Sequence, residues 1–221
     1  MKPESSGPVG VLGGTFDPIH NAHLQLAQEA RMVAGLGEVR LIPAGSPPHR
    51  HLPRAPANDR LAMARLAIKG HAALSVDEGE VRSSQPSYTV PTLRRLRIAL
   101  GMERPLVLIL GADAFVGLES WHAWRELFSL AHLLVATRPN HVLDASRMPD
   151  NLAAELTARQ CSPEGMSSVP AGRVASFVMT PMEISATAIR QRLASGESVR
   201  GLLPDSVLDY ISHHNLYQDP H

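Results

Sequence analysis

The stretch PLVLILGAD at residues 105–113 is a run of apolar residues that ends in glycine, alanine and aspartate. A strand that is apolar on both faces is typical of the centre of a parallel sheet covered by helices on each side. Similar apolar runs occur at 9–12, 39–45, 132–139 and 173–181. Strands that alternate with helices predict right-handed β-α-β units. We therefore expect an α/β fold of the Rossmann-like kind, a doubly wound, mostly parallel sheet with helices on both faces.

The segments between these runs mostly show helical spacing of apolar residues. This spacing predicts helices at about 23–34, 58–69, 93–100, 185–194 and 206–213. Asn21 is the expected N-cap of the first helix, and Gly196 is the expected stop of the fourth. A short helix holding Trp121 and Trp124, with Trp124 in the core, is expected before the strand at 132–139.

Composition restricts the class of function. The chain of 221 residues carries 21 Lys and Arg against 21 Asp and Glu, a formal net charge of zero. That balance gives no overall attraction to nucleic acid or to an acidic membrane surface. Cys161 is the single cysteine, so no disulfide can form within the chain. The N-terminus lacks the apolar core of a signal peptide, and no apolar run approaches the roughly 20 residues of a membrane helix. We expect a cytoplasmic protein that binds neither a nucleic acid polymer nor a membrane.

The stretch GGTFDPIHNAH at 13–23 follows the first predicted strand. Its glycine pair allows the backbone to approach a phosphate, and the helix N-terminus that follows offers free N–H groups. His20 and His23 lie three positions apart and so on one helix face. They could donate hydrogen bonds to charge that grows on a phosphoryl group. The alternative is an ordinary strand-to-helix turn with incidental histidines.

The same histidines raise the alternative of a metal site. No carboxylate or cysteine near His20 and His23 completes a ligand set, so we expect no protein-bound metal. A metal hydrolase that uses His20, His23, His49 and His51 is the form this alternative would take.

The stretch ISATAIR at 184–190 opens a predicted helix. Ser185 can cap that helix, and Thr187 and Arg190 lie in its first turns. A helix N-terminus with hydroxyls and an arginine is suited to a polyphosphate. Taken alone, it also fits an ordinary cap beside a solvated arginine.

Together, the two stretches resemble the HxGH and ISxTxxR motifs of a nucleotidyltransferase superfamily. From Val9 to Tyr217 the chain resembles the bacterial nicotinate-nucleotide adenylyltransferases within it. Further matching segments are IPAGSPPHR, SYTVPTL, LILGADAFVGLESW, ATRP and LLPDSVLDYISHHNLY. The resemblance implies one nucleotidyltransferase domain over 1–221, in which the C-terminal helices at about 185–217 complete the ATP site. Ala22 departs from the pattern, since it stands where the motif has glycine.

The resemblance implies adenylyl transfer from ATP to nicotinate mononucleotide, giving deamido-NAD and pyrophosphate in NAD biosynthesis. The 5′-phosphate of the mononucleotide would attack the α-phosphorus of ATP in line, without a covalent enzyme intermediate. Mg²⁺ is expected on the triphosphate. The alternatives are the same chemistry on nicotinamide mononucleotide or another phosphorylated acceptor, such as phosphopantetheine, and a nucleotide sensor without catalysis. The sequence does not fix the oligomeric state, and a homo-oligomer stays open.

The resemblance also implies roles for individual residues. The expected catalytic residues are His20, His23 and Arg190. The expected ATP-binding residues are Gly13, Gly14, Thr15, Phe16, Gly111, Asp113, Ile184, Ser185, Thr187 and Arg190. The expected mononucleotide-binding residues are His49, Arg50, Tyr88, Thr89, Trp121, His122 and Arg138. Among these, Trp121 would stack on the pyridine ring, and Arg50 and Arg138 would bind the mononucleotide phosphate.

Overall fold

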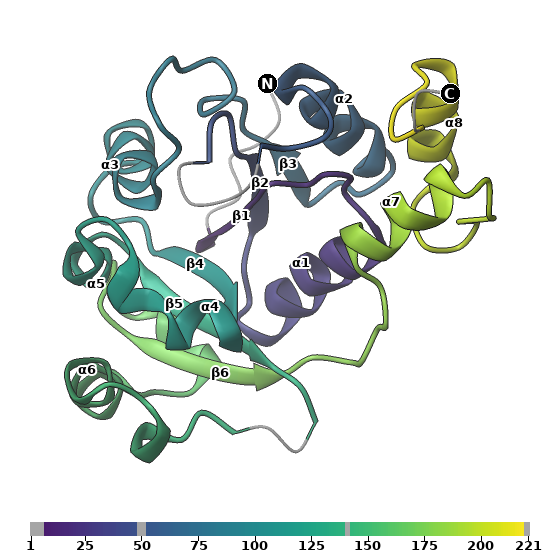
Figure 1. Ribbon diagram of the computed structural model, residues 1–221. Coiled ribbons are helices and arrows are strands. Elements are labelled where there is room, and N and C mark those ends of the chain that lie inside the picture. The colour runs from purple at the N-terminus through teal and green to yellow at the C-terminus, as the bar shows by residue number, and fades with distance from the viewer. Residues whose placement is uncertain (1–6, 48–51, 140–141, 219–221) are drawn as a thin grey trace. The chain divides into compact units, whose positions relative to one another are not determined.

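The structure is a computed structural model that describes residues 7–47, 52–139 and 142–218. Its strands are β1 (Val9–Gly14), β2 (Glu38–Pro43), β3 (Leu74–Val76), β4 (Leu106–Gly111), β5 (His132–Thr137) and β6 (Val174–Val178). Its α-helices are α1 (Asn21–Val33), α2 (Ala57–Ala67), α3 (Thr89–Leu100), α4 (Ala112–Val116), α5 (Leu127–Leu130), α6 (Asp150–Arg159), α7 (Ala186–Ala194) and α8 (Asp205–His213). Short 3-10 helices are η1 (Leu118–Ser120), η2 (Trp124–Glu126), η3 (Ala145–Arg147) and η4 (Pro163–Ser167). Figure 1 shows these elements along the chain.

The strands form a six-stranded sheet in the order β3-β2-β1-β4-β5-β6. The pairs β1·β4, β4·β5 and β5·β6 are parallel. This order reverses between β1 and β4, which is the arrangement of a doubly wound Rossmann-like sheet. The predicted α/β fold is confirmed. In such a sheet ligands bind beyond the carboxyl ends of the strands at the point of reversal.

The chain packs as two compact units, which we describe separately. Unit 1 comprises Met1–Gly13, Ala27–Arg40 and Tyr88–Pro181, and unit 2 comprises Gly14–Leu26, Leu41–Ser87 and Met182–His221. The prediction of one nucleotidyltransferase domain concerns the whole chain, and it stays a prediction.

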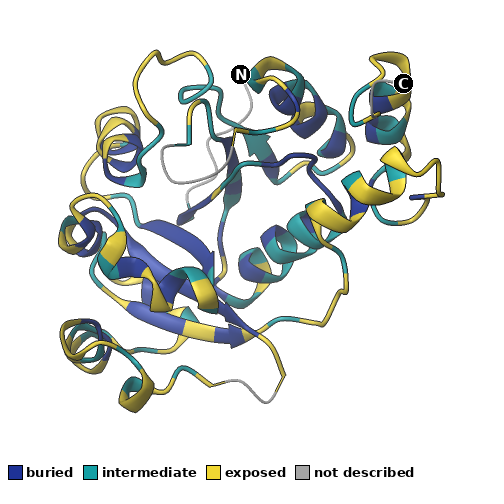
Figure 2. Cartoon of the chain, viewed as in Figure 1, coloured by how far each residue is buried: buried dark blue, intermediate teal, exposed yellow. Residues whose placement is uncertain are grey.

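The core of unit 1 is built on β4 and β5. All six residues of β5 are buried, as are the first five of β4, and Figure 2 shows both strands in dark blue. Leu93 and Leu96 of α3, both 0% exposed, add to this core. Beside them the Arg97 side chain is buried, and its guanidinium donates hydrogen bonds to backbone carbonyls. The acceptors are the oxygens of Leu130 (2.7 Å), Met102 (3.1 Å), Arg104 (2.6 Å) and Pro170 (2.7 Å). One side chain thus joins four points of unit 1.

In unit 2, helices α2 and α8 lie side by side (Figure 1). Apolar residues of α2, including Leu61 and Met63, are buried, as are Val207 and Ile211 of α8. The Tyr210 hydroxyl of α8 donates to Asp59 Oδ1 of α2 at 2.8 Å. This packing holds the C-terminal helix within unit 2.

Some element boundaries differ from the predictions. Asn21 is the first residue of α1 rather than its cap, because its side chain donates to the Gly201 carbonyl instead (2.8 Å). The prediction of a single short helix around Trp121 and Trp124 is wrong, since α4, η1, η2 and α5 occupy that region. Ala123 has a φ of 52°, a left-handed conformation that no helix continues through.

Candidate active site

The ends of β1 and β4 in unit 1 leave open space beside the backbone. A Cβ added at Gly13 or at Gly111 would have no other described atom within 4 Å. The two strands are adjacent and parallel, and the strand order reverses between them. The free backbone therefore lies where a doubly wound sheet binds its ligand.

The turn after β1 explains why residue 14 is glycine. A Cβ on Gly14 would lie 2.8 Å from the ring of Phe16, so a side chain there would collide with the turn. Phe16 itself is 2% exposed and has a φ of 50°. Its ring meets His23 edge-on, with centroids 5.0 Å apart and planes at 85°. Gly14 thus serves the packing of Phe16, and Phe16 supports a histidine of the motif. The Asp17–Pro18 peptide bond that follows is cis.

His20 and His23 form a stacked pair in unit 2. Their ring centroids lie 3.7 Å apart with planes at 21°, although His20 precedes the first residue of α1. The His20 backbone N–H donates to His23 Nδ1 at 3.2 Å, so the proton of a neutral His23 ring is on Nε2. The His20 side chain is buried, and its Nδ1 has no hydrogen-bond partner among the described residues. A buried polar atom without a partner is unusual in a folded protein, and such atoms are found at functional sites.

Burial keeps both rings uncharged. It lowers the pKa of His20 to about 4. Burial, together with the neighbouring charge of His20, lowers the pKa of His23 to about 3. At neutral pH the pair therefore offers neutral imidazole N–H groups in the free protein. Such groups donate hydrogen bonds to a phosphoryl oxygen without a prior proton transfer.

Helix α7 carries the second motif into the same unit. The Ser185 hydroxyl caps it by accepting from the Ala188 N–H at 3.2 Å, which confirms the predicted N-cap. Arg190 Nη1 donates to the backbone carbonyl of Asp17 at 2.7 Å, and Nη2 donates to the Thr187 hydroxyl at 3.3 Å. The first contact joins residues 173 positions apart in sequence. Unit 2 thus brings ISATAIR against the loop of the two histidines.

Arg60 of α2 supports that loop and was not anticipated from the sequence. It is 1% exposed and donates to the carbonyls of Thr15 (2.7 Å), Gly45 (3.2 Å) and Ala55 (3.2 Å). Burial lowers the pKa of Arg60, and the negative charge of Asp17 opposes that shift. A signal was present, because Arg60 shares a helix face with the buried Ala64 and Ala67. Its carbonyl partners, however, come from three separate segments.

Unit 1 holds the other expected residues. Tyr88 is the N-cap residue of α3, and its ring lies 4.8 Å from that of His122, tilted by 33°. Trp124 is 8% exposed, which confirms it as the core member of the tryptophan pair, whereas Trp121 is half-buried. The structure thus brings Tyr88 next to His122 and leaves part of Trp121 accessible.

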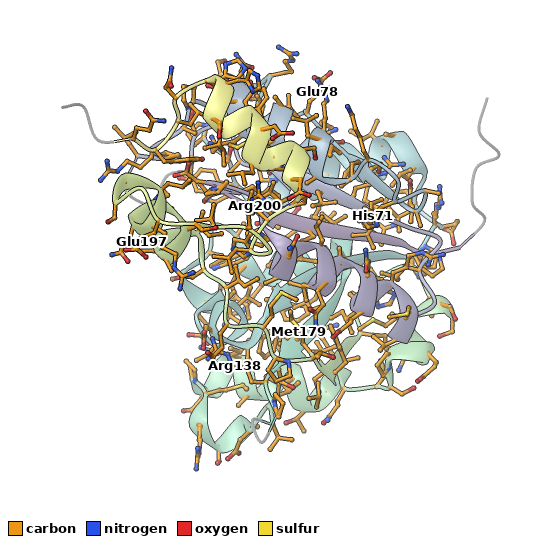
Figure 3. The ribbon with its side chains drawn as sticks, turned by 90° about the vertical axis from the view of Figure 1, so that its right-hand side faces the viewer. His71, Glu78, Arg138, Met179, Glu197 and Arg200 are labelled. Carbon is orange, nitrogen blue, oxygen red and sulfur yellow. The ribbon has the colours of Figure 1, made fainter. Side chains whose placement is uncertain are left out.

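The remaining expected residues lie as follows. Asp113 is exposed in the first turn of α4. Arg138 is exposed directly after β5 (Figure 3). Ile184 is half-buried ahead of α7 and Thr89 is the first residue of α3. His49 and Arg50 lie outside the described residues.

Residues 7–47, 52–139 and 142–218 contain no group of three or more His, Cys, Asp or Glu side chains that could hold a metal ion. His49 and His51 of the hydrolase alternative fall outside these ranges. None of the helices in the described part of the chain has the length and apolarity needed to cross a membrane.

Comparison with known proteins identifies the family. The cytidylyltransferase-like family model matches residues 11–192. A protein of Dechloromonas aromatica, named probable nicotinate-nucleotide adenylyltransferase, is 52% identical over 215 residues, 97% of this chain and 99% of the relative. A Pseudomonas putida protein of the same name is 49% identical over 212 residues, 96% of this chain and 95% of the relative. The chain belongs to the nicotinate-nucleotide adenylyltransferase family.

Solved structures agree on the fold. The nicotinic acid mononucleotide adenylyltransferase of Plasmodium falciparum, complexed with NaAD, matches with a TM-score of 0.71 and 16% identity. The match covers 96% of this chain and 97% of that one. As a member of the nicotinate-nucleotide adenylyltransferase family, the chain is a nucleotidyltransferase with a Rossmann-like fold.

Proposed function

We propose that this protein transfers the adenylyl group of ATP to nicotinate mononucleotide, producing deamido-NAD and pyrophosphate in NAD biosynthesis. The observation that carries the proposal is the hydrogen bond from Arg190 to the Asp17 carbonyl. Through this contact, one compact unit places an arginine from the first turns of α7 against the loop that carries two stacked histidines. Such a set of donors suits a polyphosphate. The names of the relatives supply the acceptor.

The chemistry follows from the charges. A 5′-phosphate oxygen of the mononucleotide forms a bond to the α-phosphorus as the bond from that phosphorus to the bridging oxygen breaks. Pyrophosphate leaves with that electron pair. His20 and His23 stabilise the charge that develops on the phosphoryl oxygens, and Arg190 binds the β- and γ-phosphates. No side chain is needed as a nucleophile.

The other ATP contacts are assigned by unit. In unit 2, Gly14 and Thr15 present backbone to the triphosphate, and Phe16 contributes through its backbone because its ring is buried. Ile184, Ser185 and Thr187 form the adenine and phosphate contacts at the start of α7. In unit 1, Gly13 and Gly111 offer open backbone, and the Asp113 carboxylate is suited to ribose hydroxyls.

For the mononucleotide, we propose the ring cluster of unit 1. Trp121 stacks on the pyridine ring, and Tyr88, Thr89 and His122 surround it. The exposed guanidinium of Arg138 binds the phosphate. His49 and Arg50 are proposed for the same substrate on sequence grounds alone.

Nucleotidyltransferases generally use a divalent cation with ATP, and we propose Mg²⁺ for this one. The described side chains do not fit a metal ion held by protein donors, since no cluster of three such groups is present among them. The ion would enter with the triphosphate on phosphate and water oxygens.

The test is incubation of the purified protein with ATP, Mg²⁺ and nicotinate mononucleotide. Chromatography with mass detection should find the dinucleotide and pyrophosphate in equal amounts, with neither formed when the mononucleotide is left out. Absence of both products, with ATP binding intact, contradicts the proposal and supports a nucleotide sensor. Parallel kinetics with nicotinamide mononucleotide test the acceptor. An equal or higher kcat/KM for the amide overturns the assignment of the acid.

A further inference from the structure

The carboxylate of Asp17 is the centre of a buried hydrogen-bond cluster in unit 2. Asp17 is 7% exposed. Its Oδ2 accepts from the Arg54 backbone N–H at 2.8 Å, and its Oδ1 accepts from the Ala55 backbone N–H at 3.0 Å. The Tyr217 hydroxyl donates to the same Oδ1 at 2.8 Å. We call these four residues the Asp17 cluster.

The cluster is adjacent to Arg190. The Asp17 backbone carbonyl accepts from Arg190 Nη1 at 2.7 Å, while the same nitrogen lies 3.9 Å from Asp17 Oδ2. The guanidinium is therefore hydrogen-bonded to the carbonyl and is close to the carboxylate without a direct hydrogen bond to it. A small rotation of the Arg190 guanidinium would move Nη1 from the Asp17 carbonyl to the Asp17 carboxylate.

Tyr217 limits that exchange. A buried carboxylate has about four lone-pair positions to satisfy. Two are met by backbone N–H groups that are fixed in position, and a third is met by the Tyr217 hydroxyl. If that hydroxyl is removed, Oδ1 loses a donor. The Arg190 guanidinium, whose Nη1 lies 3.9 Å from Oδ2, is a charged donor close enough to move onto the carboxylate. The carboxylate would then draw the guanidinium into a direct ion pair.

Two features support Tyr217 as a fixed hydrogen-bond donor. Its φ is 64°, a left-handed conformation that tyrosine rarely adopts without external support. Burial raises the pKa of the phenol, and the Asp17 carboxylate raises it further, so the hydroxyl keeps its proton and remains a donor.

We propose that Tyr217 is a positioning residue for ATP. Its hydroxyl donates to the Asp17 carboxylate and so keeps the Arg190 guanidinium on the Asp17 carbonyl, in the position from which it binds the triphosphate. The inference rests on the proposed function in one respect, the contact of Arg190 with the phosphates. It assigns to the segment after α8 a part in substrate affinity.

The chain offers a matched control. Tyr210 of α8 donates to Asp59 Oδ1 at the same distance of 2.8 Å, and burial and that hydrogen bond raise its pKa to about 12. Tyr217→Phe and Tyr210→Phe each remove one hydroxyl from one tyrosine–aspartate pair. Only the first of the two aspartates contacts Arg190 through its carbonyl.

The experiment measures ATP binding by calorimetry without a mononucleotide, and the thermal midpoint of each variant. We expect Tyr217→Phe to weaken ATP binding about ten-fold and Tyr210→Phe to weaken it by less than about two-fold, at similar losses of thermal midpoint. In steady state, Tyr217→Phe should raise KM for ATP and leave KM for the mononucleotide unchanged. Equal ATP affinities of the two variants would overturn the proposal.

The second measurement repeats Tyr217→Phe in an Arg190→Ala background. If Tyr217 acts through Arg190, its removal there changes ATP affinity by less than about two-fold. If Tyr217→Phe lowers ATP affinity in the Arg190→Ala background as much as it does in the wild-type protein, Tyr217 has a structural role and the proposal is overturned. Because ATP binding needs no acceptor, a wild-type protein that binds ATP but forms no dinucleotide contradicts only the proposed function. A wild-type protein that binds no ATP contradicts both.

Discussion

At the scale of the residue, the stacked histidines are the feature with the clearest chemical consequence. Both rings are neutral near pH 7 because burial lowers their pKa values. His23 Nδ1 accepts from the His20 backbone, so its Nε2 carries the proton. In the proposed mechanism the pair therefore contacts the phosphates as neutral hydrogen-bond donors.

Replacing one of these rings should reduce turnover. His20→Ala is expected to lower kcat by about 100-fold or more, because a donor to the transition state is lost. His213→Ala is the control, since His213 is exposed on α8 and is not among the residues proposed to contact a substrate. Steady-state rates with saturating ATP decide the matter. Near-normal turnover of His20→Ala would remove that residue from the mechanism.

The same pair should make stability depend on pH. The ordinary histidine pKa of 6.5 applies to the unfolded chain, and the folded values are about 4 and about 3. Between pH 6.5 and these values the unfolded chain binds more protons, so stability is complete above 6.5 and falls as the pH falls. The slope is up to about 1.4 kcal/mol per pH unit for each ring. Urea midpoints at about pH 7.5 and about pH 5 should differ less for a His20→Gln, His23→Gln variant.

At the scale of the element, the start of α7 depends on one hydroxyl. Ser185 caps the helix whose first turns present Thr187 and Arg190. Because the cap fixes the first turn, local stability and the proposed phosphate binding should be coupled there.

Ser185→Ala should therefore affect both properties. We expect a loss of about 1 kcal/mol in the free energy of unfolding and a higher KM for ATP. Ser195→Ala is the control, since its hydroxyl donates to the Gln191 carbonyl at the other end of α7. Chemical denaturation and ATP titrations on both variants provide the comparison. A loss of stability with no change in KM would separate the cap from the site.

The end of β4 allows an experiment that adds a side chain instead of removing one. Gly111 has a φ of −77°, which alanine adopts readily, and a Cβ there has open space among the described residues. Gly111→Ala should leave the thermal midpoint unchanged or slightly higher, because alanine restricts the unfolded chain. ATP affinity should fall, because the methyl group occupies the space proposed for the nucleotide. Unchanged affinity, measured by calorimetry, would place the nucleotide elsewhere.

At the scale of the whole molecule, buried guanidinium groups organise segments that are far apart in sequence. Arg97 does so in unit 1, where it donates to four carbonyls. Arg97→Met should lower the free energy of unfolding by roughly 2–4 kcal/mol, because those carbonyls lose their buried donor. Arg94→Met should cost much less, since Arg94 makes an exposed ion pair with Glu126. Urea denaturation of the two variants tests this difference, and equal midpoints would contradict it.

The sequence predicts the parts of the molecule that local pattern controls. The strand at 106–111 follows from its apolar run, and the cap at Ser185 follows from the residue type. The proximity of His20 and His23 follows from their spacing of three residues, although His20 itself lies just before α1. Contacts set by tertiary structure are not predictable in this way. Arg60 and Arg97 bind backbone carbonyls, which carry no residue identity, and the left-handed φ of Ala123 is not a preference of alanine.

The open backbone at Gly13 and Gly111 has a consequence for how this protein is dissected by mutation. An alanine scan finds function by deleting side chains, and a glycine has none to delete. Such a scan tests the proposed roles of His20, His23 and Arg190. It does not test the glycine backbone against which the nucleotide is proposed to bind. The role of this backbone is detected only by substitutions that add a side chain. A complete map of this protein therefore needs two libraries, one that removes atoms and one that inserts them.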